Sequence, residues 1–184
     1  MDPIPLLRGR FGRPFTFVEQ CASTQRLLEG AAEGAVAAAN EQMEGRGRLG
    51  RTWQAPAGTS LLFSIVLLPQ VLPERLPELS LIAGRAVADA IAAETGLVPV
   101  LKHPNDVLLG GRKVAGVLAE ASEGRVVLGI GINVSQTEAE FPPGASATSL
   151  RLAGARALDR TALLVTALER LEARYDAWVS DAGR

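Results

Sequence analysis

A near-continuous apolar segment from Leu61 to Leu68, closed by Pro69, is the feature that most constrains the fold of this chain. Eight residues suit one strand, and a strand without polar alternation is normally covered on both faces. We therefore expect a buried central strand here. The segment is much shorter than the roughly 18 apolar residues of a membrane span, and no other uninterrupted apolar run reaches that length. Membrane insertion is not expected.

Two long helices and one short helix are predicted around this strand. Residues 76–94 have apolar side chains at helical spacing, and Gly96 is a suitable helix stop. A second helix is predicted after Asp159, whose carboxylate suits an N-cap. Its apolar stripe indicates packing rather than a binding groove and consists of Leu164, Leu168, Leu171, Tyr175 and Trp178. A short helix, capped by Ser23 or Thr24, is expected to end at Gly30.

Further strands are predicted at residues 15–18, 35–39, 98–102, 107–120 and 125–134. Gly110-Gly111 interrupts the fourth of these segments, and Glu123-Gly124 precedes the last, so both pairs predict tight hairpin turns. The expected fold class is α+β, an α/β two-layer arrangement in which helices cover a mixed, mainly antiparallel sheet.

Composition indicates a compact domain and excludes several classes of protein. The 184 residues are 47% hydrophobic and 21% charged, which suits one core and one domain over residues 1–184. Nineteen basic residues face twenty acidic ones, so bulk charge does not support a nucleic-acid binder. Cys21 is the single cysteine and His103 the single histidine, which excludes an internal disulfide and a Cys/His metal cluster. No N-terminal signal stands out, and a reducing cytoplasm is the expected location.

Arginines alternate with glycines between Glu44 and Trp53, in the order Glu-Gly-Arg-Gly-Arg-Leu-Gly-Arg-Thr-Trp. Arginine presents a planar fork of donors that suits phosphate and carboxylate oxygens. Glycine lets main chain approach a ligand closely. The pattern predicts a loop that closes over an anion. A solvated basic loop and an RNA-contacting segment are the alternatives.

Two further segments contain polar residues next to predicted strands. Lys102-His103-Pro104-Asn105-Asp106 lies before the Gly-Gly turn that leads into Arg112-Lys113-Val114-Ala115-Gly116. Because Pro104 disfavours helix and Asn-Asp favours a turn, Asn105 and Asp106 are expected to project from a strand end. The segment Gly129-Ile130-Gly131-Ile132-Asn133 superficially resembles a dinucleotide fingerprint, but it lacks the third glycine and the following helix.

These segments, in this order and spacing, resemble the catalytic domain of biotin protein ligases. The matching motifs are Gly-Arg-Gly-Arg-x-Gly-Arg-x-Trp at 45–53, Lys-x-Pro-Asn-Asp at 102–106, Arg-Lys-x-Ala-Gly at 112–116 and Gly-x-Gly-x-Asn at 129–133. Ser23-Thr24 also lies where that family has Ser-Thr-Asn. The resemblance extends over nearly the whole chain and implies the class II synthetase-like biotin/lipoate ligase fold.

The resemblance implies a reaction in two steps. Biotin carboxylate attacks the α-phosphate of ATP, which gives biotinyl-5′-AMP and pyrophosphate, and a lysine of an acceptor protein then attacks the mixed anhydride. ATP with Mg²⁺ and biotin would be substrates, and no tightly bound prosthetic group is implied. The biotin carboxyl is ionised at neutral pH, since reference carboxylate pKa values lie near 4, so the first nucleophile needs no base. Catalysis would rest on positioning and on positive charge.

Site residues follow by carry-over onto matching positions. Biotin contacts are expected from Ser23, Thr24, Gln25, Gln42, Gly45, Arg46, Gly47, Arg48, Lys113 and Gly116. ATP contacts are expected from Arg48, Arg51, Trp53, Asn105, Asp106, Lys113 and Asn133, with Asp106 also able to reach Mg²⁺ through the phosphates. Lys113, Arg48 and Arg51 are the expected catalytic residues. Gly116 and Gly131 are expected to let backbone approach the ligand.

Several of these residues have structural alternatives. Ser23 and Thr24 suit helix capping, Trp53 suits packing of the loop, Asn133 suits a buried turn, and Lys113 suits a solvated hairpin.

The chain departs from the family pattern at four points. His103 stands where the family has Trp and is expected to be a hydrogen-bonded wall residue, and Gln25 stands where the family has Asn. We also expect no N-terminal helix-turn-helix domain, hence no DNA-dependent repression, and no C-terminal SH3-like domain, hence weak ATP binding or slow transfer.

Two alternative functions remain, and the resemblance also implies a partner. The rivals are a ligase for lipoate or octanoate and a non-catalytic biotin or nucleotide sensor. The resemblance implies the biotin carboxyl carrier protein of acetyl-CoA carboxylase as the partner, docking near a free sheet edge, and a homodimer through such edges is a further expectation. No DNA or membrane partner is expected.

Overall fold

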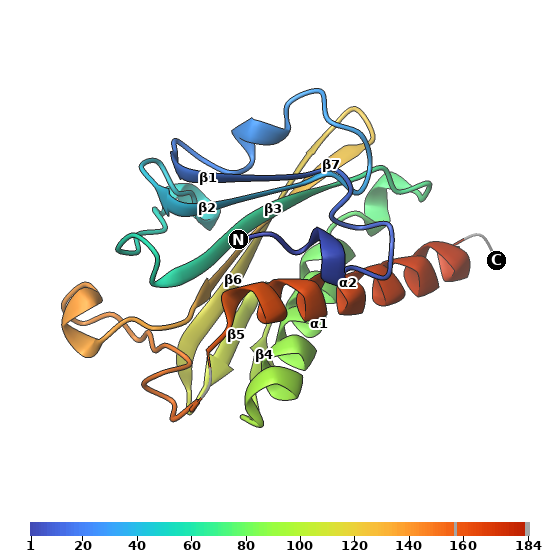
Figure 1. The fold of residues 1–184 in the computed structure, drawn as a ribbon. Coiled ribbons are helices and arrows are strands. Elements are labelled where there is room, and N and C mark those ends of the chain that lie inside the picture. Colours follow the sequence, from blue (N-terminus) through green and yellow to red (C-terminus); the bar gives the residue numbers. More distant parts are fainter. Residues whose placement is uncertain (157, 183–184) are drawn as a thin grey trace.

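The computed structural model describes residues 1–156 and 158–182, so residues 157, 183 and 184 of the expected domain lie outside the described part. Within the described residues, seven strands form one sheet in the order β1-β2-β3-β7-β6-β5-β4 (Figure 1). The strands are β1 (Phe15–Cys21), β2 (Val36–Gln42), β3 (Ser60–Leu67), β4 (Val100–Lys102), β5 (Asp106–Leu109), β6 (Arg112–Ser122) and β7 (Arg125–Asn133). β1 pairs with β2 in parallel and every other neighbouring pair is antiparallel. The predicted mixed, mainly antiparallel sheet is confirmed.

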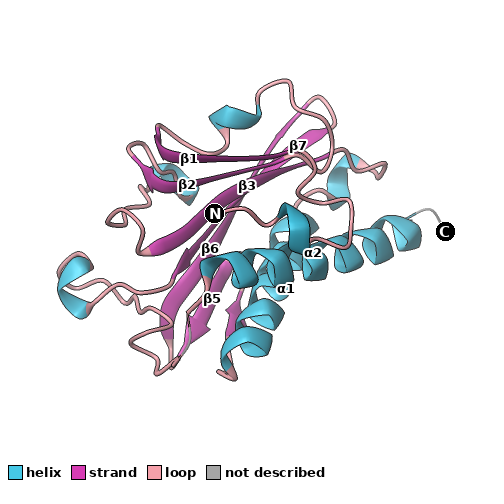
Figure 2. Cartoon of the chain, viewed as in Figure 1, coloured by secondary structure: helices cyan, strands magenta, loops and turns pink. Residues whose placement is uncertain are grey.

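Two long helices, α1 (Glu78–Thr95) and α2 (Arg160–Ala182), lie together on one face of the sheet (Figure 2). α1 ends at Gly96, which adopts a left-handed conformation with φ of 71°. α2 begins as predicted, because Asp159 Oδ1 accepts hydrogen bonds from the backbone of Thr161 at 2.7 Å and of Ala162 at 3.2 Å. Within residues 1–156 and 158–182, neither helix is long and apolar enough to cross a membrane.

The two faces of the sheet have different roles, and β3 shows how the sequence separates them. Its odd-numbered residues, such as Phe63 and Ile65, are buried in the main core with both long helices. Val66 belongs to a smaller cluster with Leu28 on the other face. Side chains alternate along a strand, so Ser64 shares the face of Val66. The apolar segment is therefore covered on both sides, as predicted.

Short 3₁₀ turns connect the other elements, at Ile4–Leu6, Arg26–Leu28, Arg48–Gly50, Pro73–Arg75 and Glu138–Glu140. The predicted capping of a short helix by Ser23 or Thr24 is wrong. The turn at Arg26–Leu28 begins after Gln25, without a side-chain cap, and it ends before Gly30. The hydroxyl of Thr24 is instead bonded to side chains of β2 and β3. The strand predicted from residue 98 also begins later, at Val100, which is the first residue paired with β5.

Candidate active site

Small residues on three neighbouring strands form the floor of a pocket on the face of the sheet away from the helices. Gly116 of β6 lies opposite Gly131 of β7, and Gly129 of β7 lies opposite Ser64 of β3. The alternation of glycine with isoleucine along β7 puts the isoleucines on the helix face and leaves the other face nearly bare. A large side chain from elsewhere in the chain can therefore lie directly on the strands.

Trp53 fills this space. A Cβ atom added to Gly131 would lie 2.6 Å from Cε2 of the Trp53 indole, and one added to Gly116 would lie 3.1 Å from its Cζ3. At these two glycines the backbone lies close to the Trp53 indole, and at Gly116 an added Cβ would also lie 3.0 Å from Cε and Nζ of Lys113. Nε1 of Trp53 is buried and has no hydrogen-bond partner among the described residues.

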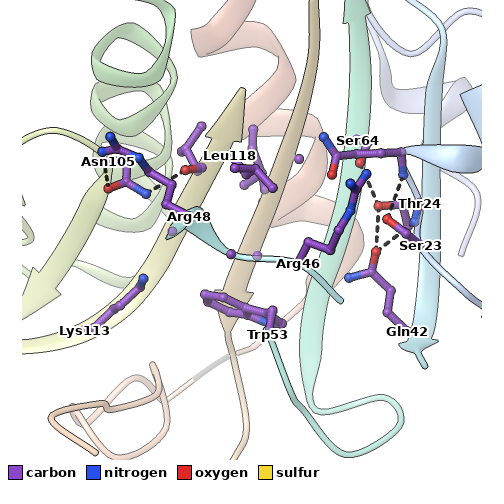
Figure 3. Close-up of a pocket in the computed structure, with 17 residues that line it drawn as sticks. Ser23, Thr24, Gln42, Arg46, Arg48, Trp53, Ser64, Asn105, Lys113 and Leu118 are labelled. Atoms are coloured by element: carbon purple, nitrogen blue, oxygen red, sulfur yellow. Dashed lines mark hydrogen bonds between the residues drawn. The ribbon is translucent and has the colours of Figure 1, made fainter. Parts of the chain in front are cut away.

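A narrow pocket of about 50 Å³ lies beside Trp53, and one end of it is polar (Figure 3). The backbone N–H and the hydroxyl of Thr24 donate to Gln42 Oε1, at 2.7 and 3.0 Å. The Ser64 and Thr24 hydroxyl oxygens are 2.7 Å apart. Because Thr24 gives its proton to an amide oxygen that can only accept, Ser64 must donate to Thr24. The lone pairs of Ser64 and the amide N–H groups of Gln42 therefore remain for a ligand with both donors and acceptors.

The arginine-glycine segment forms a small hairpin over the pocket. Trp53 N–H donates to the Gly45 carbonyl at 2.8 Å, and Gly47 N–H donates to the Arg51 carbonyl at 2.7 Å. Arg46 forms an ion pair of 2.7 Å with Glu120 of β6.

At the tip of the hairpin, Arg48 donates to Asn105 Oδ1 at 3.4 Å. Asn105 in turn donates to the carbonyl of Val117 at 2.7 Å, which holds the amide against β6. Two arginines of the loop thus each contact a polar side chain of the β5–β6 region.

Lys113 lies at the other end of the pocket, and Figure 3 shows it on the opposite side of Trp53 from Thr24 and Ser64. Its Nζ is 2.6 Å from Asp106 Oδ1 and 5.5 Å from the centre of the Trp53 ring. The side chains of Lys113 and Asp106 are 32% and 25% exposed, so the ion pair is accessible to a ligand.

A wider hollow of about 440 Å³ adjoins the narrow pocket and shares Trp53 and Lys113 with it. Arg51 and Lys102 add two more cationic side chains to its lining, and Asp106 and Asn133 add oxygen atoms. Asn133 is 5% exposed and donates from Nδ2 to the Thr148 carbonyl at 3.0 Å. The hollow can therefore hold a polyanion larger than the ligand of the narrow pocket.

The predicted site residues fall into three groups. The narrow pocket is lined by Ser23, Thr24, Gln25, Gln42, Arg46, Gly47, Arg48, Trp53, Asn105, Lys113 and Gly116. The wider hollow is lined by Arg51, Trp53, Asp106, Lys113 and Asn133. Gly45 lines neither, since it is buried against the backbone of Trp53.

His103 is exposed and lines neither pocket, so the expected wall role for it is wrong. Its exposure follows from its place in the turn between β4 and β5. No group of three or more His, Cys, Asp or Glu side chains within the described residues is placed to hold a metal ion.

Sequence reasoning missed part of the narrow pocket, namely Ser64, Val117, Leu118, Gly129 and Ile130. Ser64 had a usable signal, because it is the one hydroxyl in the apolar segment 61–68 and is fully buried. A buried hydroxyl needs a hydrogen-bond partner, which places a polar group over the central strand. Gly129 had a weaker signal in its two-residue spacing from Gly131.

The fold and the site define a class of protein: an α+β domain with a narrow polar pocket joined to a wider cationic hollow. The biotin protein ligase of Aquifex aeolicus, solved with biotin and ATP, has a similar fold, with a TM-score of 0.82 and 34% identity over 91% of this chain and 72% of that chain. The class II synthetase-like fold is thus confirmed.

Sequence comparison identifies the family. Residues 15–136 match the Biotin/lipoate A/B protein ligase family. A biotin–[acetyl-CoA-carboxylase] ligase of Mycobacterium tuberculosis is 43% identical over 184 residues, which cover 92% of this chain and 67% of that protein. The bifunctional ligase/repressor BirA of Bacillus subtilis is 35% identical over 176 residues, with 89% of this chain covered. The chain therefore belongs to the biotin/lipoate A/B protein ligase family. It spans 54% of the length of the Bacillus relatives.

Proposed function

We propose that this chain is an ATP-dependent ligase that converts biotin to biotinyl-5′-AMP and transfers the biotinyl group to a lysine of a biotin carboxyl carrier protein. The observation that supports this most directly is the position of Lys113, which lines both the narrow pocket and the wider hollow. A carboxylate in the first and a triphosphate in the second would meet at one ammonium group. The names of the relatives from Mycobacterium tuberculosis and Paracoccus denitrificans support the acetyl-CoA carboxylase carrier as acceptor.

The narrow pocket suits the biotin head group. A ureido ring offers two N–H donors and one carbonyl acceptor, which match the free lone pairs of Ser64 and the amide N–H groups of Gln42. The Gln25 side chain lies against Gly129 in this pocket, where an added Cβ would be 3.1 Å from Gln25 Cδ. A linear octanoyl or lipoyl chain would leave these buried polar groups without partners, which costs about 1–3 kcal/mol for each group. Biotin is therefore favoured over these acids.

Adenylation in this site needs alignment and charge rather than a base. The biotin carboxylate is already ionised and attacks the α-phosphorus, and the bond to the pyrophosphate oxygen breaks. We assign Lys113 and Arg48 to the carboxylate and α-phosphate, and Arg51 to the departing pyrophosphate. Mutation of one donor to charge that develops in a transition state typically costs about 3–4 kcal/mol.

Mg²⁺ would enter as part of the ATP complex. Its preference for one or two carboxylates together with phosphate oxygens fits a site with the single carboxylate of Asp106. Asn105 and Asn133 would hold the nucleotide side, and Trp53 would line the space between the two substrates.

The second step requires a lysine of the acceptor to reach the mixed anhydride. The amine attacks the biotinyl carbonyl carbon and AMP leaves with the anhydride oxygen. β1 and β4 are the edge strands of the sheet in the described residues, and free edges are suited to pairing with another chain. We propose the acceptor and any second copy of the chain as candidates for these edges.

Mass-spectrometric detection of biotinyl-5′-AMP after incubation with biotin and MgATP tests the proposal, with octanoate as a competing acid. Lys113→Ala should abolish the adenylate. Arg112→Ala is the matched control, since Arg112 precedes Lys113 on β6, pairs with Glu138 and lines neither pocket. Adenylate from octanoate in preference to biotin would indicate a different acyl ligase. Biotin binding with no adenylate from the unmodified chain would indicate a sensor.

A further inference from the structure

A network of buried polar side chains lies directly behind the wider hollow. Asn133 at the end of β7, Gln136 after it, Ser60 at the start of β3, and Thr148 and Ser149 are each at most 5% exposed. Gln136 is 1% exposed and lines none of the pockets described above, so it contacts no substrate directly. Polar groups buried this deeply need a structural or functional reason.

The hydrogen bonds of the network have a fixed direction. The Thr148 carbonyl can only accept, so Asn133 must present Nδ2 to it, at 3.0 Å. The Oδ1 of Asn133 then faces Gln136, which must present Nε2, at 3.0 Å. The same Nε2 also donates to Ser60 Oγ at 2.6 Å. The orientation of the Gln136 amide is thus determined by two acceptors on two strands.

The backbone of Gln136 continues the network to the segment 146–149. Ser149 Oγ donates to the Gln136 carbonyl at 2.7 Å. Side chain and main chain of Gln136 therefore connect β3 and β7 to both Thr148, through Asn133, and Ser149 directly. Loss of the Gln136 amide would leave Asn133 Oδ1 without that donor in a buried position, which is unfavourable.

The segment 146–149, which the network fixes, is also hydrogen-bonded to the backbone of Lys113. Lys113 N–H donates to the Ser146 carbonyl at 2.9 Å, and Thr148 N–H donates to the Lys113 carbonyl at 2.8 Å. These two bonds form a parallel bridge between Lys113 and Ala147. Ala145, Ser146 and Ala147 line the wider hollow together with the Lys113 side chain. A shift of this segment would therefore move both the wall of the hollow and the backbone of Lys113.

We infer that Gln136 is a positioning residue for the proposed adenylation step, which acts through Asn133 and the segment 146–149 to set the position of Lys113. The inference rests on the proposed function for its kinetic consequences. The polar end of the narrow pocket is independent of the network, since the mutual hydrogen bonds of Thr24, Gln42 and Ser64 involve no residue of the network. Gln136 thus supports the Lys113 end of the site, which adjoins the wider hollow, and not the polar end of the narrow pocket.

The test is Gln136→Met, which keeps the length of the side chain and removes its amide. We expect the KM for MgATP to rise and kcat for adenylation to fall, with a combined loss of about tenfold or more in kcat/KM, while the Kd for biotin changes by a smaller factor than the KM for MgATP. Ser149→Ala should show the same pattern more weakly. Tyr175→Phe is the matched control: Tyr175 is 3% exposed, bonds Glu33 at 2.8 Å and lies in α2, on the other face of the sheet.

Amide hydrogen exchange provides a readout that needs no substrate. In Gln136→Met the backbone amides of Lys113 and Thr148 should exchange faster. Exchange at Val117 should not change, because Val117, on the same strand as Lys113, donates its N–H to the carbonyl of Asn105, outside the network. If Gln136 serves stability alone, the variant should have a lower Tm, unchanged kinetics of the folded fraction, and faster exchange spread evenly over the amides, as expected for Tyr175→Phe. That result would overturn the inference. If the unmodified chain forms no adenylate, the proposed function fails, and the exchange pattern still decides whether Gln136 positions Lys113.

Discussion

Lys113 Nζ lies 2.6 Å from Asp106 Oδ1, although the two residues are not paired across their strands. Asp106 is aligned with Gly116, and Lys113 is aligned with Leu108. A register irregularity between Val107 and Leu108 separates these two alignments. Bulges re-aim side chains in this way and are common beside active sites. The ion pair places the lysine at the boundary of two pockets, with its counterion in the wall of the wider hollow.

Asp106→Asn tests what the counterion does. The amide keeps the shape but removes the charge that holds Lys113, so we expect kcat/KM for adenylation to fall about tenfold, less than for Lys113→Ala. If Asp106 also reaches Mg²⁺ through the phosphates, the Mg²⁺ concentration for half-maximal rate should rise in the same variant, since amides are weaker ligands than carboxylates. Pyrophosphate release measures both quantities. Unchanged kcat/KM and unchanged Mg²⁺ dependence would show that Lys113 needs no anchor.

Ser64→Ala tests one of the pocket residues that the sequence did not predict. The variant removes the donor to Thr24 and an acceptor for the ligand, and one hydrogen bond is worth about 0.5–1.5 kcal/mol. We expect the Kd for biotin to rise about two- to tenfold, with little effect on the KM for ATP, as measured by calorimetry and by adenylation kinetics. Ser122→Ala, at the exposed end of β6, is the control. A biotin Kd equal to that of the control would remove Ser64 from the site.

The fold followed from the sequence where the signal was local. The apolar segment 61–68 and the carboxylate of Asp159 each predict an element from a few adjacent residues, and both elements begin within one residue of the expected start. The pairing of β3 with β7 could not be predicted in this way. β3 pairs with β7, some 60 residues later, and no turn residue specifies that contact. Long-range pairing depends on which faces fit together, which short patterns do not encode.

The site shows the same division. The arginine, lysine and asparagine residues that line the two pockets were predicted because their motifs are visible in the sequence. Thr24 was expected both to cap a helix and to face the pocket, and its hydroxyl is hydrogen-bonded to Gln42 and Ser64 with no helix cap observed. That outcome requires knowing that β2 and β3 lie beside Thr24. The role of Gln136 likewise depends on contacts with Ser60 and Ser149, which lie 76 and 13 residues away.

A pH-dependent contribution to stability is expected from Arg10 and Asp176, far from the site. The Arg10 guanidinium donates to Asp176 at 2.9 Å, and this hydrogen bond, together with the positive charge, holds the pKa of the carboxyl below its ordinary value of 3.8. A lowered pKa means that the stabilisation is present at neutral pH and is lost as pH falls through the acidic range. Both side chains are about half exposed, so the pair is worth less than about 1 kcal/mol.

Asp176→Asn should therefore lower the free energy of unfolding slightly at pH 7, and the difference from the unmodified chain should shrink below about pH 4. Urea unfolding at pH 7 and at pH 3 measures both values. Asp181→Asn, on the same helix and 74% exposed, is the matched control and should have a smaller effect at pH 7. A difference of the same size at both pH values would contradict an ionic origin.

Gly131→Ala tests whether the bare floor of the site exists for Trp53. An added methyl would lie 2.6 and 2.7 Å from two atoms of the indole, which is closer than carbon atoms can approach, so the ring must move. Because Trp53 lines both pockets, we expect biotin affinity and the KM for ATP to worsen together, unlike in Ser64→Ala. The emission of Trp53, read in a Trp178→Phe background, should shift as the indole leaves the sheet.

The double variant separates the indole from the other neighbours of Gly131. In a Trp53→Ala background the methyl group of Gly131→Ala meets no ring, so it should cause little further loss of activity, and the two substitutions should be strongly non-additive. Residues in contact typically show interaction energies of about 0.5–3 kcal/mol in such a cycle. If Gly131→Ala costs the same with and without the indole, the glycine is required by the ligand itself, and Trp53 lies on the floor only because space is available there.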